Sequence, residues 1–312
     1  MIGLHSALKQ NYRNLEILCV DDGSTDGSYK KIARIAKRDK RIRLIKTEHK
    51  GSGVARNIAL DAATGKYVMF LDMDDEYPDK KTVGKLVSKA EETGFDIVGG
   101  SMIRSVDKNI ERDWDDACKG FVFECEGPIE FKDYQFEYGF YRFIYRRDFL
   151  SREQIRFPYY LRYQDTLFMA QAMHKAGRFY ALPDVVYLYH MHVKLGKWNE
   201  QQSIDCIKAL ADMLRFATDN SYERLAHTTV MRINDFVPKM VEHFKSDEVR
   251  KACDEFLSEA KKVEPLDEYC YDVWERLGNE VLLQNDITKS KSYRIGRSIT
   301  AIPRMIRSLF TK

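Results

Sequence analysis

The stretch YVMFLDMDDE, residues Tyr67–Glu76, decides how the rest of the chain is interpreted. Its first half is apolar and β-favouring and runs directly into acids, which predicts a buried strand that delivers carboxylates to an open sheet edge. Because side chains two apart on a strand point the same way, we expect Asp72 and Asp74 to face one point. Carboxylates crowded in this way suit a divalent cation, and the structural alternative is a solvated turn after a core strand.

Strands and helices alternate along the first part of the chain. Leu15–Val20 is a short apolar run, and Asp21 and Asp22 follow it directly, as the acids of the opening stretch follow theirs. This alternation predicts a parallel α/β sheet whose strand ends gather on one edge, where ligands bind. Both acidic clusters should therefore lie on that edge. The expected strands are at 15–20, 42–46, 67–71, 95–98, 178–182 and 185–189, and the expected helices begin near 29, 51 (closed by Gly65), 79 (closed by Gly94) and 164.

Composition limits the class of protein. Of the 312 residues, 44% are apolar and 32% are charged, which is typical of a soluble globular protein of about two domains. The net charge of +3 gives no argument for a nucleic-acid partner. The six cysteines lack C-x-x-C spacing, which favours buried thiols in a reducing compartment over a zinc site or a disulfide framework. The sequence shows no signal peptide and no apolar run long enough for a membrane span, so we expect a cytoplasmic protein.

From about Gln201 onward the pattern indicates helices only, the last of them at 273–283. We therefore expect an α/β domain over 1–200, a helical region over 201–288 and a basic amphipathic tail over 289–312. The tail contains seven basic residues and no acid, which fits a peripheral contact with an anionic membrane surface. A terminal helix docked on its own protein fits the same pattern.

Three ordered motifs resemble those of the family 2 glycosyltransferases of the GT-A fold: Val20–Asp26, Gly51–Asn57 and Phe70–Asp75. Their order, spacing and strand-end placement agree, and three motifs within about sixty residues are far more specific than any one alone. The resemblance extends to Tyr187-Leu188-Tyr189 and so covers roughly residues 1–190. It implies an α/β fold of the GT-A type, a Rossmann-like and mostly parallel sheet flanked by helices, followed by a helical region.

The resemblance also assigns roles to donor-site residues. A divalent cation, Mn²⁺ or Mg²⁺, would be held by Asp74 with Asp72 alongside and would neutralise charge on the departing diphosphate. Asp21 and Asp22 would lie beside the nucleotide, and Arg56 near the nucleotide or its diphosphate. The structural alternatives are an Asx-turn for one acid of the first pair and a surface helix position for the arginine.

Asp165 is the candidate general base, because inverting transfer needs a carboxylate to take the proton of the acceptor hydroxyl. The family has Glu-Asp at this place, whereas this chain has Gln164-Asp165; the structural alternative is a helix N-cap. His190 and His192 follow a Tyr-x-Tyr pattern where some GT-A enzymes carry a metal or phosphate ligand, and His192 is the candidate metal ligand. Structural roles are the alternative for both histidines, as packing is for Trp198.

The resemblance implies an inverting, metal-dependent glycosyltransferase. It would move a sugar from a nucleotide-sugar donor, UDP-linked, to a saccharide or lipid-linked acceptor in cell-surface polysaccharide synthesis at the cytoplasmic membrane face. Family members begin with a strand that ends in a Pro-x-Tyr/Phe-Asn type motif, and this sequence starts inside what resembles the following helix, near Leu4. The first strand of the family is thus expected to be absent, and the alternative function is a truncated, inactive scaffold that binds a partner.

Two other enzyme classes fit the residues less well. A phosphotransferase that holds magnesium with a strand-end D-x-D leaves the Asp-Asp-Gly-Ser and Ala-Arg-Asn stretches unexplained. A dinucleotide-dependent oxidoreductase needs a third glycine after Gly51-Ser52-Gly53, and the sequence does not have it.

Overall fold

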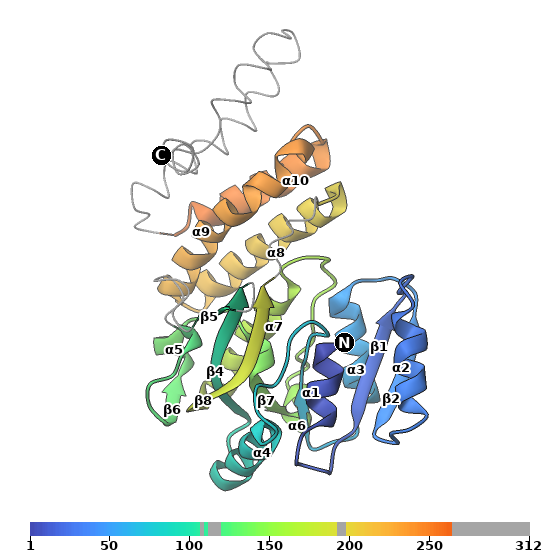
Figure 1. Cartoon of the computed structure of the whole chain (residues 1–312). Coiled ribbons are helices and arrows are strands. Elements are labelled where there is room, and N and C mark those ends of the chain that lie inside the picture. The colour runs from blue at the N-terminus through green and yellow to red at the C-terminus, as the bar shows by residue number, and fades with distance from the viewer. Residues whose placement is uncertain (107–108, 112–119, 192–197, 264–312) are drawn as a thin grey trace, which may run out of the picture. The chain divides into compact units, whose positions relative to one another are not determined.

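The computed structural model describes residues 1–106, 109–111, 120–191 and 198–263. The chain forms two compact units, Met1–Gly196 and Lys197–Lys312 (Figure 1). The basic tail and a helix expected at 273–283 lie outside the described residues.

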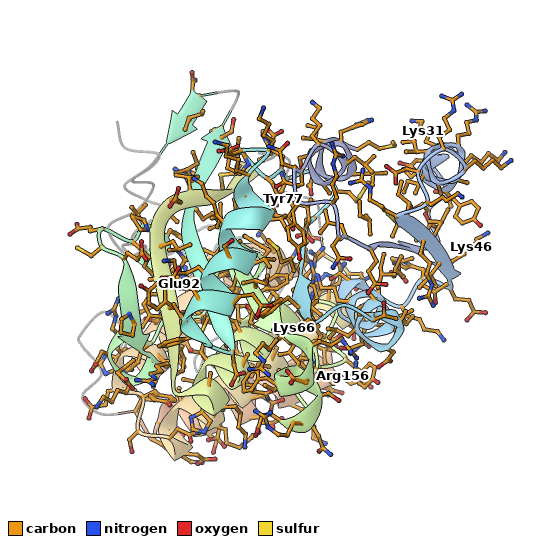
Figure 2. All side chains as sticks on the ribbon, turned by 90° about the horizontal axis from the view of Figure 1, so that it is seen from below. Lys31, Lys46, Lys66, Tyr77, Glu92 and Arg156 are labelled. Carbon is orange, nitrogen blue, oxygen red and sulfur yellow. The ribbon has the colours of Figure 1, made fainter. Side chains whose placement is uncertain are left out.

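The first unit begins with a parallel two-stranded sheet and its helices. Helix α1 (Ile2–Leu8) precedes β1 (Ile17–Asp22), and α2 (Ser28–Ala36) connects β1 to β2 (Ile42–Thr47). Helix α3 (Ser52–Ala62) follows. Strand β1 runs two residues further than expected, so that Asp21 and Asp22 are its last residues. Figure 2 shows Lys31 of α2 and Lys46 of β2 projecting outward, and the apolar side chains beneath these elements form a small core of Leu4, Cys19, Ile32 and Ile42.

A six-stranded sheet forms the rest of this unit, with the order β3-β7-β4-β8-β6 and β5 paired to β4. Among the described strands of this sheet, β4 and β8 pair in parallel and the other neighbours are antiparallel. The strands are β3 (Tyr67–Met69), β4 (Ile97–Val106), β5 (Asn109–Glu111), β6 (Gly127–Glu130), β7 (Phe143–Arg146) and β8 (Arg178–Met191).

Helices cover both faces of this sheet. On one face, Leu86 and Ala90 of α4 (Thr82–Thr93) pack against Ile144 of β7 and neighbouring strand residues. On the other face, the ring of Tyr145 lies 5.6 Å from that of Phe168 in α7 (Gln164–Ala176). Adjacent residues of β7 thus enter opposite cores, as the alternation of side chains along a strand requires. The shorter helices are α5 (Phe131–Tyr134), η2 (Phe140–Arg142) and α6 (Arg147–Arg152).

The expected α/β class, with a sheet flanked by helices, is confirmed. The expectation that the first three strands join one parallel sheet is wrong, because β3 pairs antiparallel with β7, which comes later in the chain. The order of strands and helices along the sequence does not determine which strands pair. The pairing depends on which strand faces become buried in the same core.

Two boundaries differ from expectation and a third agrees with it. The two strands expected at 178–182 and 185–189 are one strand, β8, whose pairing with β4 shifts register after Gly100. Gly94 closes α4 in the left-handed conformation, at a φ of 71°, as predicted. Gly65, however, does not close α3, which ends at Ala62.

The described part of the second unit is helical. It contains α8 (Glu200–Asp219), α9 (Glu223–Met240), η3 (Val241–His243) and α10 (Asp247–Ala260). Helix α8 starts with a capping box between Asn199 and Gln202, which satisfies backbone N–H groups at its first turn. The ring of Trp198 lies 5.5 Å from that of Phe236, a packing contact. Within residues 1–263, as far as they are described, no helix has the length and apolar character needed to cross a membrane.

Candidate functional site

Asp22 organises the turn that precedes α3. Its carboxylate accepts hydrogen bonds from the backbone N–H groups of Lys50 and Gly51, each at 2.8 Å. Gly51 has a φ of 94°, and a Cβ there would lie 2.9 Å from Leu161, so this turn requires glycine. Asp22 therefore fixes the start of the helix that carries Arg56.

Asp21 is buried, and its Oδ1 accepts a hydrogen bond from the backbone N–H of Ser24 at 3.1 Å. This is the local turn bond that the sequence offers as an alternative for one acid of the pair. Asp21 thus stabilises the turn that follows β1, and Asp22 stabilises the turn that follows β2. Because β1 and β2 are parallel, both turns lie at the same end of the two-stranded sheet.

Arg56 connects α3 to the loop Asp72–Glu76 that follows β3, called the acidic loop below. Its Nη2 donates a hydrogen bond to Asp72 Oδ1 at 2.8 Å. The guanidinium also lies 4.8 Å from the ring centroid of Phe140 and 5.4 Å from that of Phe157, and the side chain is only 16% exposed. Burial works against the charge of Arg56, but the carboxylates of Asp72 and Asp165 raise its pKa above the ordinary value. The structure therefore holds a charged guanidinium among aromatic rings and acids.

Asp165 lies in the first turn of α7 and is half-buried. Burial raises the pKa of Asp165 above its ordinary value, the positive charge of Arg56 opposes this, and the negative charge of Asp72 adds to it. The N-cap alternative for Asp165 is wrong, because Tyr163 occupies that position. Gln164 donates from Nε2 to Ser52 Oγ at 2.7 Å, which fastens the start of α7 to the start of α3. The structure thus brings Arg56, Asp72 and Asp165 together.

The acidic loop is tied to the end of β8. Asp75 is 1% exposed; its Oδ2 accepts from the hydroxyl of Tyr187 and its Oδ1 from the backbone N–H of His190, both at 2.7 Å. Glu76 and Leu188 exchange backbone hydrogen bonds at 3.2 and 2.9 Å. Asp74 lies in the same loop and is exposed.

Asp75 differs electrostatically from its neighbours. Burial raises its pKa to about 7, the hydrogen bonds from His190 and Tyr187 oppose this, and the negative charges of Asp74 and Asp72 add to it. Burial and the nearby carboxylates likewise keep the hydroxyl of Tyr187 protonated by raising its pKa. Neither role is evident from the sequence, although Asp75 belongs to the opening acidic cluster and Tyr187 to the Tyr-x-Tyr pattern.

Three tyrosine rings lie beside these acids. Tyr141 stacks on Tyr187 at 4.2 Å between centroids, and its ring is nearly parallel to that of Tyr189 at 6.2 Å. Tyr189 is half-buried; burial and then the carboxylate of Asp75 raise its pKa to about 12. The rings therefore supply a neutral aromatic surface next to charged groups.

Of the two candidate histidines, the structure describes His190 but not His192. His190 Nε2 lies 3.1 Å from Glu76 Oε1, so this side chain has a carboxylate partner within the protein. His192 lies outside the described residues. In the part of the chain that the structure describes, no three His, Cys, Asp or Glu side chains form a group suited to a metal ion.

Known proteins have similar sequences. Residues 3–153 match the sequence model of Glycosyl transferase family 2. The chain is 28% identical over 242 residues to the succinoglycan biosynthesis protein ExoO of Rhizobium meliloti (strain 1021), a match that covers 72% of this chain and 67% of that protein. It is 31% identical over 191 residues to the uncharacterized glycosyltransferase EpsJ of Bacillus subtilis (strain 168), which covers 60% of this chain and 55% of that protein.

A third relative is the putative teichuronic acid biosynthesis glycosyltransferase TuaG of Bacillus subtilis (strain 168), 36% identical over 132 residues, or 39% of this chain and 52% of that protein. The chain thus spans between about half and two thirds of the length of these curated relatives.

Solved structures share the fold. S. aureus TarS 1-349 superposes with a TM-score of 0.65 at 20% identity, over 95% of this chain and 87% of that one. A mannosyltransferase from Pyrobaculum calidifontis, in complex with GDP-Man and Mn²⁺, has a TM-score of 0.55 at 18% identity, over 99% of this chain and 82% of that one. On the family match, its relatives and this shared fold, residues 3–153 belong to glycosyl transferase family 2, in a chain with the GT-A fold.

Proposed function

We propose that the chain transfers a sugar, with inversion, from a nucleotide-sugar donor, UDP-linked, to a saccharide or lipid-linked acceptor in cell-surface polysaccharide synthesis. The observation that carries this proposal is the convergence of Arg56, Asp72 and Asp165 in a family 2 chain. Relatives named for succinoglycan and teichuronic acid biosynthesis support the role in polysaccharide synthesis. A neighbour that holds GDP-Man and Mn²⁺ supports a nucleotide-sugar donor.

Arg56 is the proposed partner of the donor diphosphate or nucleotide. Its guanidinium is charged, rests on Phe140 and Phe157, and already binds an oxygen of Asp72. A phosphate oxygen offers the same acceptor geometry as that carboxylate. Asp21 and Asp22, at the end of β1, are proposed to lie beside the nucleotide; in support, Asp22 holds the turn that starts the helix of Arg56, and Asp21 holds the turn after β1.

Asp72 and Asp74 are the proposed ligands of a divalent cation. Mg²⁺ and Mn²⁺ take oxygen ligands, and Mg²⁺ is often bound by one or two carboxylates together with water and substrate phosphates. The exposed Asp74 and the half-buried Asp72 fit such a donor set without a third protein ligand. A bound cation would supply charge neutralisation for the departing diphosphate. His192 stays a predicted additional ligand.

Asp165 is the proposed general base. It would accept the proton of the acceptor hydroxyl while that oxygen bonds to the anomeric carbon and the bond from this carbon to the diphosphate breaks. A raised pKa makes its carboxylate a stronger base than an ordinary aspartate, and Arg56 nearby favours the ionised form. Gln164 has a neutral amide, which cannot act as a general base, and its Nε2 donates to Ser52 Oγ.

The location of the protein also stays a proposal. The basic segment 289–312 would bring the chain to an anionic membrane surface on the cytoplasmic side, where lipid-linked acceptors lie. Co-sedimentation with vesicles that contain anionic lipid, compared between the full chain and a chain ending at residue 288, tests this contact. Equal binding of both chains would contradict it.

UDP titration tests the proposed function most directly. We expect calorimetry to show UDP binding that requires Mn²⁺ and that Asp74→Asn abolishes. Asp133→Asn is the matched control, because Asp133 is an exposed aspartate of α5 outside the proposed site. A folded wild-type protein that binds neither UDP nor GDP with Mn²⁺ would refute the donor site.

A further inference from the structure

The hydroxyl of Tyr187 connects the two sides of the acidic loop. It donates to Asp75 Oδ2 at 2.7 Å and accepts from the backbone N–H of Asp72 at 3.3 Å. Asp74, the proposed cation ligand, lies between these two attachment points. One hydroxyl therefore sets the separation of the residues on either side of Asp74.

The ring that carries this hydroxyl is itself held in place. Tyr187 is fully buried, and its ring stacks on Tyr141 at 4.2 Å with an interplanar angle of 20°. Backbone hydrogen bonds between Glu76 and Leu188 fix the neighbouring residue of β8 to the same loop. The hydroxyl thus projects from a rigid strand, and the exposed Asp74 is positioned relative to that strand.

We infer that Tyr187 is a positioning residue that presents Asp74 to a divalent cation by holding Asp72 and Asp75 at a fixed separation. The inference rests on the proposed donor site. Groups that hydrogen-bond to the support of a metal ligand commonly set metal affinity, because they limit the positions that the ligand samples.

The substitution Tyr187→Phe isolates the hydroxyl. The phenylalanine ring keeps the stacking on Tyr141, whereas Asp75 loses a hydrogen-bond donor and the N–H of Asp72 loses its acceptor. We expect the Mn²⁺ concentration needed for half-maximal UDP binding to rise about 10- to 100-fold, the usual effect of removing such a supporting group. We also expect backbone amides of residues 72–76 to exchange faster in the metal-free protein, because the loop opens more often.

Tyr145→Phe is the matched control. Tyr145 is also fully buried, and its hydroxyl donates to the backbone carbonyl of Phe140 at 2.8 Å, away from the acidic loop. This variant should lose a comparable amount of thermal stability but keep the wild-type Mn²⁺ dependence and the wild-type exchange at 72–76.

Four outcomes decide the inference. A changed Mn²⁺ dependence and faster loop exchange in Tyr187→Phe alone would support it. Wild-type behaviour of Tyr187→Phe would overturn it and leave the proposed function standing. Equal loss of binding in both tyrosine variants would overturn it by showing a general loss of stability. Absence of Mn²⁺-dependent UDP binding by the wild type would overturn the proposed function and the inference together.

Discussion

Replacing Asp75 with asparagine should make the protein more resistant to unfolding above pH 7 and leave its stability nearly unchanged near pH 4. Asp75 is 1% exposed, and burial raises its pKa from 3.8 to about 7. The folded protein therefore binds this proton more tightly than the unfolded chain does. The favourable contribution is complete below pH 3.8 and is lost as the pH rises toward about 7, where the buried carboxylate must ionise.

The size of the stability effect follows from the difference between the pKa of Asp75 in the folded protein, about 7, and its ordinary value of 3.8. About three pH units correspond to about 4 kcal/mol, because each pH unit is equivalent to about 1.4 kcal/mol. Asparagine resembles the protonated carboxyl: its oxygen accepts from the N–H of His190, and its amide donates to the hydroxyl of Tyr187. The free energy of unfolding of Asp75→Asn minus that of the wild type should therefore grow by up to about 4 kcal/mol between about pH 4 and pH 8.

Urea unfolding without divalent cations, followed by tyrosine and tryptophan fluorescence at several pH values, measures this difference. Subtracting the wild type cancels the titration of all other groups. The exposed Asp133→Asn is the control, and its difference from the wild type should not depend on pH. A pH-independent difference for Asp75→Asn would refute the argument that burial of this carboxyl controls its pKa.

Three further variants test the site and the core. Asp165→Asn should lower kcat about 100- to 10,000-fold with UDP binding intact; unchanged turnover contradicts the base assignment. Because the base must be ionised and burial raises its pKa, the wild-type kcat/KM should rise with pH through a value above 3.8, and an acid limb at or below 3.8 contradicts this. Arg56→Lys should weaken UDP binding about tenfold in calorimetry, since the planar guanidinium is lost; equal affinity contradicts its role. Leu86→Ala, in the core beneath α4, should cost about 2–5 kcal/mol in urea unfolding and leave UDP affinity unchanged; a smaller loss shows that the core relaxes around the cavity.

Local patterns in the sequence were sufficient to predict most elements. The apolar run before Asp72 and the glycine at 94 predicted a strand and a helix end that the structure contains. The alternation of elements, with acids at the strand ends, predicted the α/β class. These signals work because helix and strand periods, and the φ angles of glycine, depend on neighbours only a few residues away.

Only the tertiary structure decided which of these elements meet. β3 pairs with β7, not with the strands before it in the sequence. Arg56 reaches Asp72 across 16 residues, and Tyr187 reaches Asp75 across 112. Four acids in one loop look alike in a sequence, yet Asp75 is buried and hydrogen-bonded, Asp72 and Glu76 face Arg56 and His190, and Asp74 is exposed. Burial and distant partners separate their chemistry, and both arise only when the sheet assembles.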